Sequence, residues 1–305
     1  MTAPLLALKI DVDTDRGTAK GVARLAHLLE NLDARATFLF SLGPDHTGRA
    51  ARRVFRRGFM KKVHRTSVLK HYGFRTLLYG TLLPGPHIGR RRAGEMRAVE
   101  RDGFEVGVHC YDHVKWQDNV AHADDAWTQR ELALAQEQFA DVFSRPAAVH
   151  GAAGWQMNAS VPRYEQQLGF QYASDTRGYA PFRPVTNGTV YGVPQLPTTL
   201  PTLDEIIGRS GSAPNDIERH LLRLTETPRD HVFTLHAEME GGAFLDVFCS
   251  LVQAWRTQGY RICDLATLFA GLELARLPMH AIARGRIGGR SGTLAIQSPP
   301  LLRPA

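Results

Sequence analysis

Cysteine is scarce in this chain and forms no recognisable pattern. Among 305 residues there are only three, Cys110, Cys249 and Cys263, and none of them belongs to a CxxC pair. A scattered, odd-numbered set indicates neither a disulfide framework nor a thiolate zinc site. We therefore expect the protein to work in a reducing compartment.

Long hydrophobic runs are missing as well. No uninterrupted apolar stretch reaches the roughly 18 residues that a membrane-spanning helix needs. The opening stretch MTAPLLALKIDVDT reaches acidic side chains almost at once and lacks the successive regions of a signal peptide. We expect no export through a signal peptide, and if a membrane is involved, we expect the protein to lie on its surface.

Acidic residues are absent between Asp45 and Glu95. The same segment carries thirteen lysines and arginines, more than the net charge of +7, so the rest of the chain is net acidic. A concentrated block of positive charge is expected to face an anionic partner.

The pattern inside this basic segment favours a lipid surface. A helix from Arg49 would place Val54, Phe55 and Phe59 on one face and arginines on the other, and the apolar stretch FRTLLYGTLLPGP follows it. Each Lys or Arg near anionic lipid contributes about 1 kcal/mol to membrane binding. We predict that residues 49–83 meet an anionic membrane surface. A solvated basic helix packed on the domain, or a nucleic-acid surface, are the alternatives.

Strand and helix patterns alternate along most of the chain. LLALKIDVD is typical of a buried strand, TAKGVARLAHLLENL of an amphipathic helix, and ATFLF of the next strand. The rhythm continues through EVGV, AAVHG, FQYASD, VYGVPQLP, HVFTLHAE and YRICD. It predicts an α/β fold with six to eight mostly parallel strands closed into a barrel. The segment from Arg284 is rich in Gly, Arg and Pro and is expected to be a loosely packed tail.

Acidic and histidine residues follow three of these strands. Asp11 and Asp13 are two residues apart and share one face of the first strand, although Asp and Thr in DVDTDRG would also suit a helix cap. In EVGVHCYDH, His109 and His113 are four apart, and TLHAE places His236 at the end of another strand. Each histidine alone is more often structural than catalytic.

Taken together, these residues indicate a metal site. The carboxyl ends of parallel strands meet at the mouth of a barrel, where active sites lie. One carboxylate and two histidines form a three-ligand set for Zn²⁺ or a similar divalent ion. The remaining carboxylate and histidine would then form a base and acid pair.

The three motifs resemble those of the polysaccharide deacetylase family, the NodB-homology carbohydrate esterases of family 4. The resemblance implies a distorted (β/α) barrel of about seven parallel strands, and an amide hydrolase with one domain over residues 1–290, an insertion at 45–89 and a tail at 291–305. It also implies one divalent ion, Zn²⁺, Mn²⁺ or Co²⁺. The implied roles are metal ligation by Asp13, His109 and His113, a base at Asp11, an acid at His236, and an aspartate that supports this acid at Asp175.

Several blocks sharpen the resemblance within that family. SLGPDHTGR, AAGWQ, SDTRGYAPFRP and QLPTTLPTLDEIIGR resemble the branch that removes formyl groups from 4-formamido-arabinose carried on undecaprenyl phosphate. This implies a lipid-linked sugar substrate, peripheral attachment to the cytoplasmic face of the inner membrane, and a role in lipid A modification and polymyxin resistance. A deacetylase of N-acetylated polysaccharide is the alternative within the family. We expect no nucleic-acid partner, since a basic nucleic-acid binder would leave the Asp and His residues unexplained.

Two departures from the family pattern concern the base. Val12 separates two aspartates that are usually adjacent, so Asp11 is assigned as the base by analogy with a spaced variant. The third family motif normally supplies an arginine that orients the base, and VHGAAGWQ contains none. His150 or Arg177 could replace this arginine, or Trp155 could shape a pocket there instead.

Overall fold

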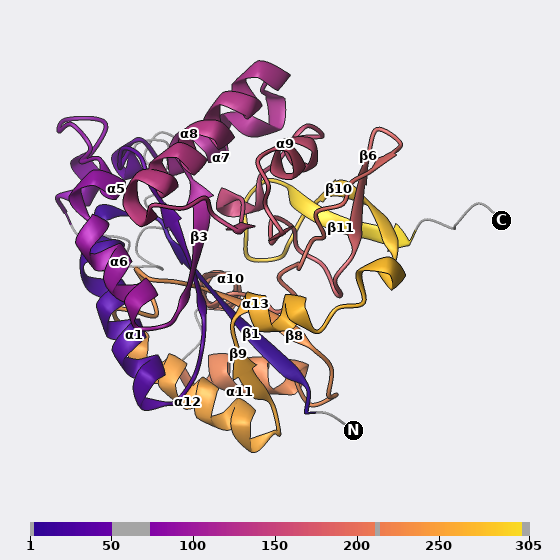
Figure 1. Cartoon of the computed structure of the whole chain (residues 1–305). Helices are drawn as coiled ribbons and strands as arrows, with labels where there is room; N and C mark the ends of the chain where they lie inside the picture. Colours follow the sequence, from indigo (N-terminus) through magenta and orange to yellow (C-terminus); the bar gives the residue numbers. More distant parts are fainter. Residues whose placement is uncertain (1–2, 51–73, 211–213, 301–305) are drawn as a thin grey trace.

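A parallel sheet of seven strands forms the centre of the molecule (Figure 1). The computed structural model describes residues 3–50, 74–210 and 214–300. The strands run in the order β5-β4-β3-β2-β1-β8, and β9 pairs with the first residues of β1. Their bounds are β1 Leu5–Val12, β2 Thr37–Ser41, β3 Glu105–Cys110, β4 Val149–His150, β5 Tyr172–Ala173, β8 His231–His236 and β9 Arg261–Cys263.

An irregular segment, residues 194–200, closes the gap between the two ends of this sheet. The backbone N–H of Leu196 donates to Ala173 of β5 at 2.7 Å, and that of Thr199 donates to Val232 of β8 at 3.0 Å. The expected strand VYGVPQLP is therefore wrong for most of its length. Pro194 and Pro197 have no N–H to donate, so the segment cannot form a continuous ladder. The predicted distorted barrel is confirmed, and this segment is where it is distorted.

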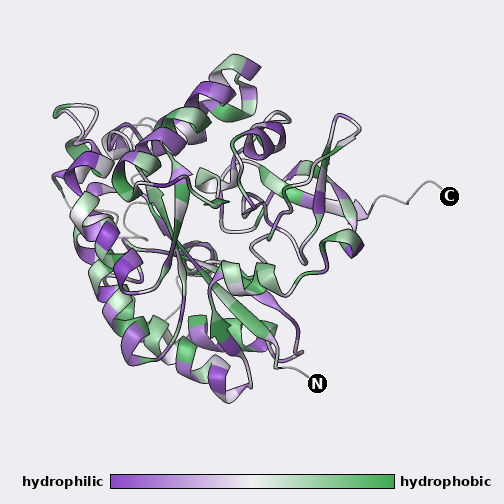
Figure 2. Ribbon diagram, in the orientation of Figure 1, coloured by the Kyte–Doolittle hydropathy of each residue, from purple (hydrophilic) through white to green (hydrophobic). Residues whose placement is uncertain are grey.

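Amphipathic helices cover the outside of the sheet, and their apolar faces turn inward (Figures 1 and 2). Val22, Leu25 and Leu29 of one helix are buried in the main core together with Phe248 and Trp255 of another. Burial of each such side chain contributes about 1.5–3 kcal/mol. The helices are α1 Val22–Asn31, α5 Ile88–Arg91, α6 Ala93–Arg101, α7 His113–Asn119, α8 Asp125–Phe143, α9 Val161–Gln167, α10 Leu203–Ser210, α11 Pro214–Leu224, α12 Leu245–Thr257 and α13 Leu265–Ala270.

A second, four-stranded sheet lies beside the barrel in Figure 1. It consists of β6 Arg183–Thr186, β7 Thr189–Val190, β10 Met279–Gly285 and β11 Leu294–Pro300. The expectation of a loosely packed C-terminal segment is wrong, because β11 pairs with β10 and buries Leu294 and Ala295. The apolar residues Leu294, Ala295 and Ile296 make β11 a packed strand, which the Gly, Arg and Pro content concealed.

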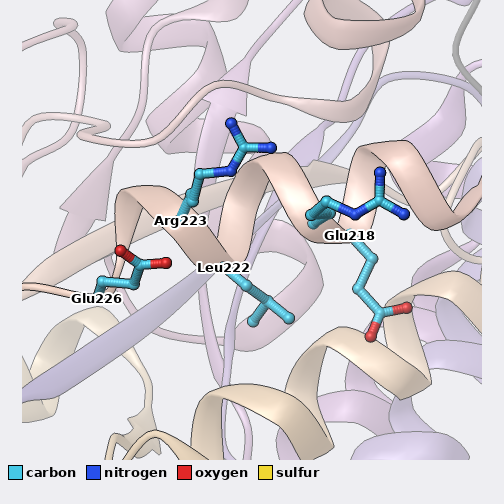
Figure 3. A pocket seen from close by; sticks show the side chains of 5 residues that line it. Glu218, Leu222, Arg223 and Glu226 are labelled. Carbon is cyan, nitrogen blue, oxygen red and sulfur yellow. The ribbon is translucent and has the colours of Figure 1, made fainter.

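The predicted basic helix lies almost entirely outside the described residues, since only Arg49 and Ala50 of it are described. No helix in the described part of the chain is both long and apolar enough to cross a membrane. A hollow of about 430 Å³ lies along α11, among Glu218, Arg219, Leu222, Arg223 and Glu226 (Figure 3). None of the predicted site residues lines it.

Candidate metal and catalytic site

Strand β1 and the residue that follows it carry the two aspartates into the barrel. Leu6, Leu8 and Ile10 belong to the core under the helices, whereas Ala7 belongs to a separate cluster with Leu39 and Val232. Because side chains alternate along a strand, Lys9, Asp11 and Asp13 share the side of Ala7. All three are at least nine-tenths buried.

The HCYDH motif places its two histidines on either side of a tight connection. His109 lies near the end of β3, and His113 is the first residue of α7. Asp112 caps this helix by accepting a hydrogen bond from the N–H of Lys115, and His46 Nδ1 lies 2.6 Å from its other oxygen. This cap fixes the start of α7 and with it the position of His113.

Asp13, His109 and His113 converge on one point. Nε2 of His109 lies 3.3 Å from Asp13 Oδ1, and Nε2 of His113 lies 3.4 Å from the same oxygen. His109 Nδ1 donates to the carbonyl of Gly151 at 2.6 Å, so its Nε2 is the lone-pair nitrogen and faces Asp13. Asp13 Oδ1 is buried without a hydrogen-bond partner. An orphaned carboxylate oxygen beside two such rings fits a divalent ion.

The electrostatics of the group also favour a cation. Burial opposes ionisation of Asp13, but the imidazoles of His113, His109 and His236 outweigh it and hold the pKa of this carboxyl well below its usual range. Burial lowers the pKa of His113, which favours the neutral ring that a metal requires. The Asp13 carboxylate is therefore charged, and positive charge beside it is favourable.

A buried glutamate, Glu238, fixes the loop that carries Asp13. Its Oε1 accepts the N–H groups of Asp13 and Thr14 at 3.1 and 2.9 Å and the hydroxyl of Thr14 at 2.7 Å. Burial raises its pKa to about 8. A Cβ at Gly17 would lie 1.9 Å from this oxygen, so glycine is the residue that leaves Glu238 in this position. Residue Glu238 belongs to the predicted TLHAE motif, yet its role could not be read from the sequence.

His236 lies directly across from Asp11 on the neighbouring strand, in register with it. Burial disfavours its charged form, but Asp13, Asp204 and Asp11 raise the pKa of His236 above its ordinary value. Its Nδ1 is buried and has no hydrogen-bond partner. The structure thus brings together all five predicted residues, Asp11, Asp13, His109, His113 and His236. The raised pKa of His236, the candidate acid, favours its protonated form.

Asp175 has different partners from those expected. Its Oδ1 accepts the N–H of Ala152 at 2.7 Å and lies 3.1 Å from His150 Nδ1, while its Oδ2 accepts from Gln195 at 2.7 Å. Among the described residues it makes no hydrogen bond to His236. The acidic groups that act on His236 are instead Asp13, Asp204, Asp11 and Glu240, whose Oε2 accepts the backbone N–H of His236 at 2.9 Å.

His150, Glu165 and Asp175 form a second buried group of possible ligands. In this group a proton on His150 Nδ1 faces both carboxylates. Burial disfavours a charged His150, but Asp175 and Glu165 outweigh it and raise the pKa of His150 to about 10. His150 Nδ1 lies 2.7 Å from Glu165. A protonated imidazole beside a carboxylate is already neutralised, so this group does not need a metal.

Comparison with solved structures shows which proteins share this fold. The fold is that of a Mycobacterium smegmatis protein described as a polysaccharide deacetylase, with a TM-score of 0.64 at 14% identity over 94% of this chain and 96% of that one. A family 4 acetyl xylan esterase from Clostridium thermocellum, in complex with a cobalt ion, gives a TM-score of 0.53 at 12% identity over 90% and 97%. The chain therefore has the fold of the polysaccharide deacetylases and of carbohydrate esterase family 4.

Sequence comparison then specifies the family. A Shewanella sediminis (strain HAW-EB3) protein, described as a probable 4-deoxy-4-formamido-L-arabinose-phosphoundecaprenol deformylase, is 32% identical over 293 residues, or 96% of this chain and 94% of the relative. No model of a protein family matches the chain. The chain belongs to the family of the 4-deoxy-4-formamido-L-arabinose-phosphoundecaprenol deformylases and is a hydrolase of amide carbon–nitrogen bonds. This confirms the resemblance found in the sequence.

Proposed function

We propose that this protein deformylates 4-deoxy-4-formamido-L-arabinose on undecaprenyl phosphate. The observation that carries the proposal is the convergence of Asp13, His109 and His113 beside Asp11 and His236. The products would be formate and the 4-amino sugar lipid, a precursor for lipid A modification and polymyxin resistance. The name of the Shewanella relative supports this substrate.

The three ligands would hold one divalent ion, Zn²⁺, Mn²⁺ or Co²⁺. Two imidazoles and a carboxylate accept each of these ions, and the cobalt ion in the Clostridium esterase supports metal use in this fold. When bound, the ion would act as a Lewis acid toward the formamide carbonyl. Neighbouring groups keep the ligands in place: the backbone carbonyl of Gly151 orients His109, the Asp112 side chain caps the helix of His113, and Glu238 holds the Asp13 loop.

Two side chains would move the protons. Asp11 takes a proton from the attacking water while the water oxygen bonds to the formyl carbon. The carbon–nitrogen bond then breaks, and His236 gives a proton to the departing sugar nitrogen. The raised pKa of His236 suits it to arrive protonated at this step. The close alignment of Asp11 and His236 across β1 and β8 would place base and acid on the same substrate.

We further propose that the protein attaches peripherally to the cytoplasmic face of the inner membrane through residues 49–83. Within the described part of this segment, Phe74 and Leu82 expose 71% and 80% of their surfaces. This described part lies near the site, because Gly80 packs against His46, the partner of Asp112. A lipid-linked substrate would thus enter beside an apolar, basic surface.

Vesicle co-sedimentation tests the attachment. Wild-type protein should bind vesicles that contain anionic phospholipid, more weakly at high salt, and Leu82→Glu should reduce the bound fraction several-fold. Leu224→Glu is a matched control, since Leu224 is exposed on α11, outside the basic segment. Equal binding by wild type and Leu82→Glu would contradict the proposed surface.

A paired substrate assay tests the formyl specificity. Synthetic 4-formamido- and 4-acetamido-arabinose phosphoprenols should be offered at equal concentration, with formate and acetate measured as products. Formate release at least about tenfold faster than acetate release is expected. Faster acetate release would favour the N-acetyl deacetylase alternative.

A further inference from the structure

We propose that Lys9 is the cation that positions the base Asp11, in place of the arginine missing from the third motif. This inference rests on the proposed function, in which Asp11 is the base. Lys9 is fully buried two residues before Asp11 on the same face of β1. Its Nζ lies 3.7 Å from Asp11 Oδ1, an oxygen that is buried without a hydrogen-bond partner.

The surroundings of Lys9 fix its ammonium group. Nζ donates to the carbonyl of Ser174 at 2.8 Å and lies 5.3 Å from the ring centre of Trp155. A Cβ at Gly151 would come within 3.1 Å of Cε and 3.3 Å of Nζ, so the lysine packs closely on this glycine. Its position is therefore determined from three sides.

Burying a charged lysine without a partner of opposite charge destabilises the folded state, and two carboxylates offset this penalty. Burial lowers the pKa of Lys9, and Asp11 and then Asp175 oppose this shift. Two neighbouring residues thus stabilise the Lys9 ammonium group: the carbonyl of Ser174 accepts its hydrogen bond, and the charge of Asp175 favours its protonated form. This explains why Asp175 faces this side of the site although it makes no hydrogen bond to His236.

The other candidates are occupied elsewhere. His150 Nδ1 is shared between Glu165 and Asp175. The Arg177 guanidinium binds Glu205 and donates to the carbonyl of Leu200 at 2.9 Å. Trp155 is enclosed by Lys9 and by two guanidinium groups, those of Arg177 and Arg290, at 5.0 and 4.4 Å from its ring centre. It provides a surface for these cations and no charge of its own.

Activity in single and double variants tests this role. Lys9→Met should lower kcat at least about tenfold, leave KM within about twofold, and leave the bound metal unchanged, because Lys9 touches no proposed ligand. Lys9→Arg should recover part of the lost kcat. In an Asp11→Asn background, Lys9→Met should have little further effect, since a positioning residue acts only through its partner.

Arg177→Met provides the matched control, because it removes another buried cation from Trp155 without contact to Asp11. It should change kcat by the same factor in the wild-type and Asp11→Asn backgrounds. If Lys9→Met also changes kcat equally in both backgrounds, Lys9 is merely structural and the proposal is wrong.

A second measurement separates this proposal from the proposed function. The unfolding equilibria of wild type, Lys9→Met, Asp11→Asn and the double variant form a cycle that needs no substrate. The combined effect should depart more than about twofold from the product of the single effects. Coupling without formate release from the wild type would reject the deformylase function and retain the pairing. Formate release without coupling would reject the role of Lys9.

Discussion

His109 and Gly151 are joined by a hydrogen bond of 2.6 Å between the imidazole Nδ1 and the glycine carbonyl. A carbonyl only accepts, so in the neutral imidazole that binds a metal the proton lies on Nδ1 and the lone pair lies on Nε2. That lone pair faces Asp13 Oδ1 at 3.3 Å. Gly151, 42 positions away in the sequence, thus orients His109 of β3 as a ligand.

Replacing His109 by alanine should remove the bound metal. Two ligands would remain for an ion that normally takes at least three from a protein. The purified variant should contain less than about a tenth of the metal of the wild type and should release no formate. Metal analysis after gel filtration measures this directly. His27→Ala, on the exposed face of α1, is the control and should keep its metal. Full metal occupancy in His109→Ala would exclude His109 as a ligand.

Gly17→Ala should loosen the loop that holds Asp13. The new Cβ would lie 1.9 Å from Glu238 Oε1, so the glutamate must move away from the N–H groups of Asp13 and Thr14. We expect a loss of about 1–3 kcal/mol in the free energy of unfolding and weaker metal binding. Denaturant titration and metal competition measure the two effects.

Gly94→Ala is the matched control for Gly17→Ala. Gly94 lies in helix α6, and a Cβ there would meet nothing within 4 Å. Alanine should stabilise this helix by up to about 1 kcal/mol. If both variants leave metal affinity unchanged, the bonds from Glu238 do not hold the Asp13 loop.

The charged His150 should make stability depend on pH above neutrality. Its pKa is raised from 6.5 to about 10 in the folded protein, so the folded state binds this proton more tightly than the unfolded state. The stabilisation is complete below about pH 6.5 and declines as pH rises toward 10, by up to about 1.4 kcal/mol per pH unit. Unfolding in urea between pH 6 and 10 measures the decline.

His150→Gln isolates this effect from other titrating groups. The variant should be less stable near pH 6 but should lose less stability than the wild type between pH 6.5 and 10. Parallel pH profiles for both proteins would show that His150 is not protonated in the folded state.

The sequence predicted the parts of the site that follow strand periodicity. Asp11, Asp13, His109, His113 and His236 each stand at or near the end of an apolar strand, and parallel strands bring such ends together. Lys9 escaped notice because one lysine in LLALKIDVD does not disturb the apolar pattern of a strand.

Other features depend on contacts that no local pattern encodes. Arg290 lies close to Trp155 and reaches Glu205 at 2.7 Å, although the surrounding sequence is typical of a tail. The partners of Asp175 are 20 to 25 residues away: Gln195 lies in the irregular closure at 194–200, and His150 and Ala152 lie in and just after strand β4, which pairs with β5. The expected support of His236 by Asp175 came from family resemblance, and the local geometry differs from it.

The most direct test is formate release from 4-formamido-arabinose phosphoprenol by protein that has first been stripped of metal. Zn²⁺, Mn²⁺ and Co²⁺ are then returned one at a time, with wild type and His109→Ala assayed side by side. We predict no release by the stripped wild type, restored release with at least one ion, and none by His109→Ala with any ion. Undiminished release by a folded, metal-free wild type would contradict this prediction.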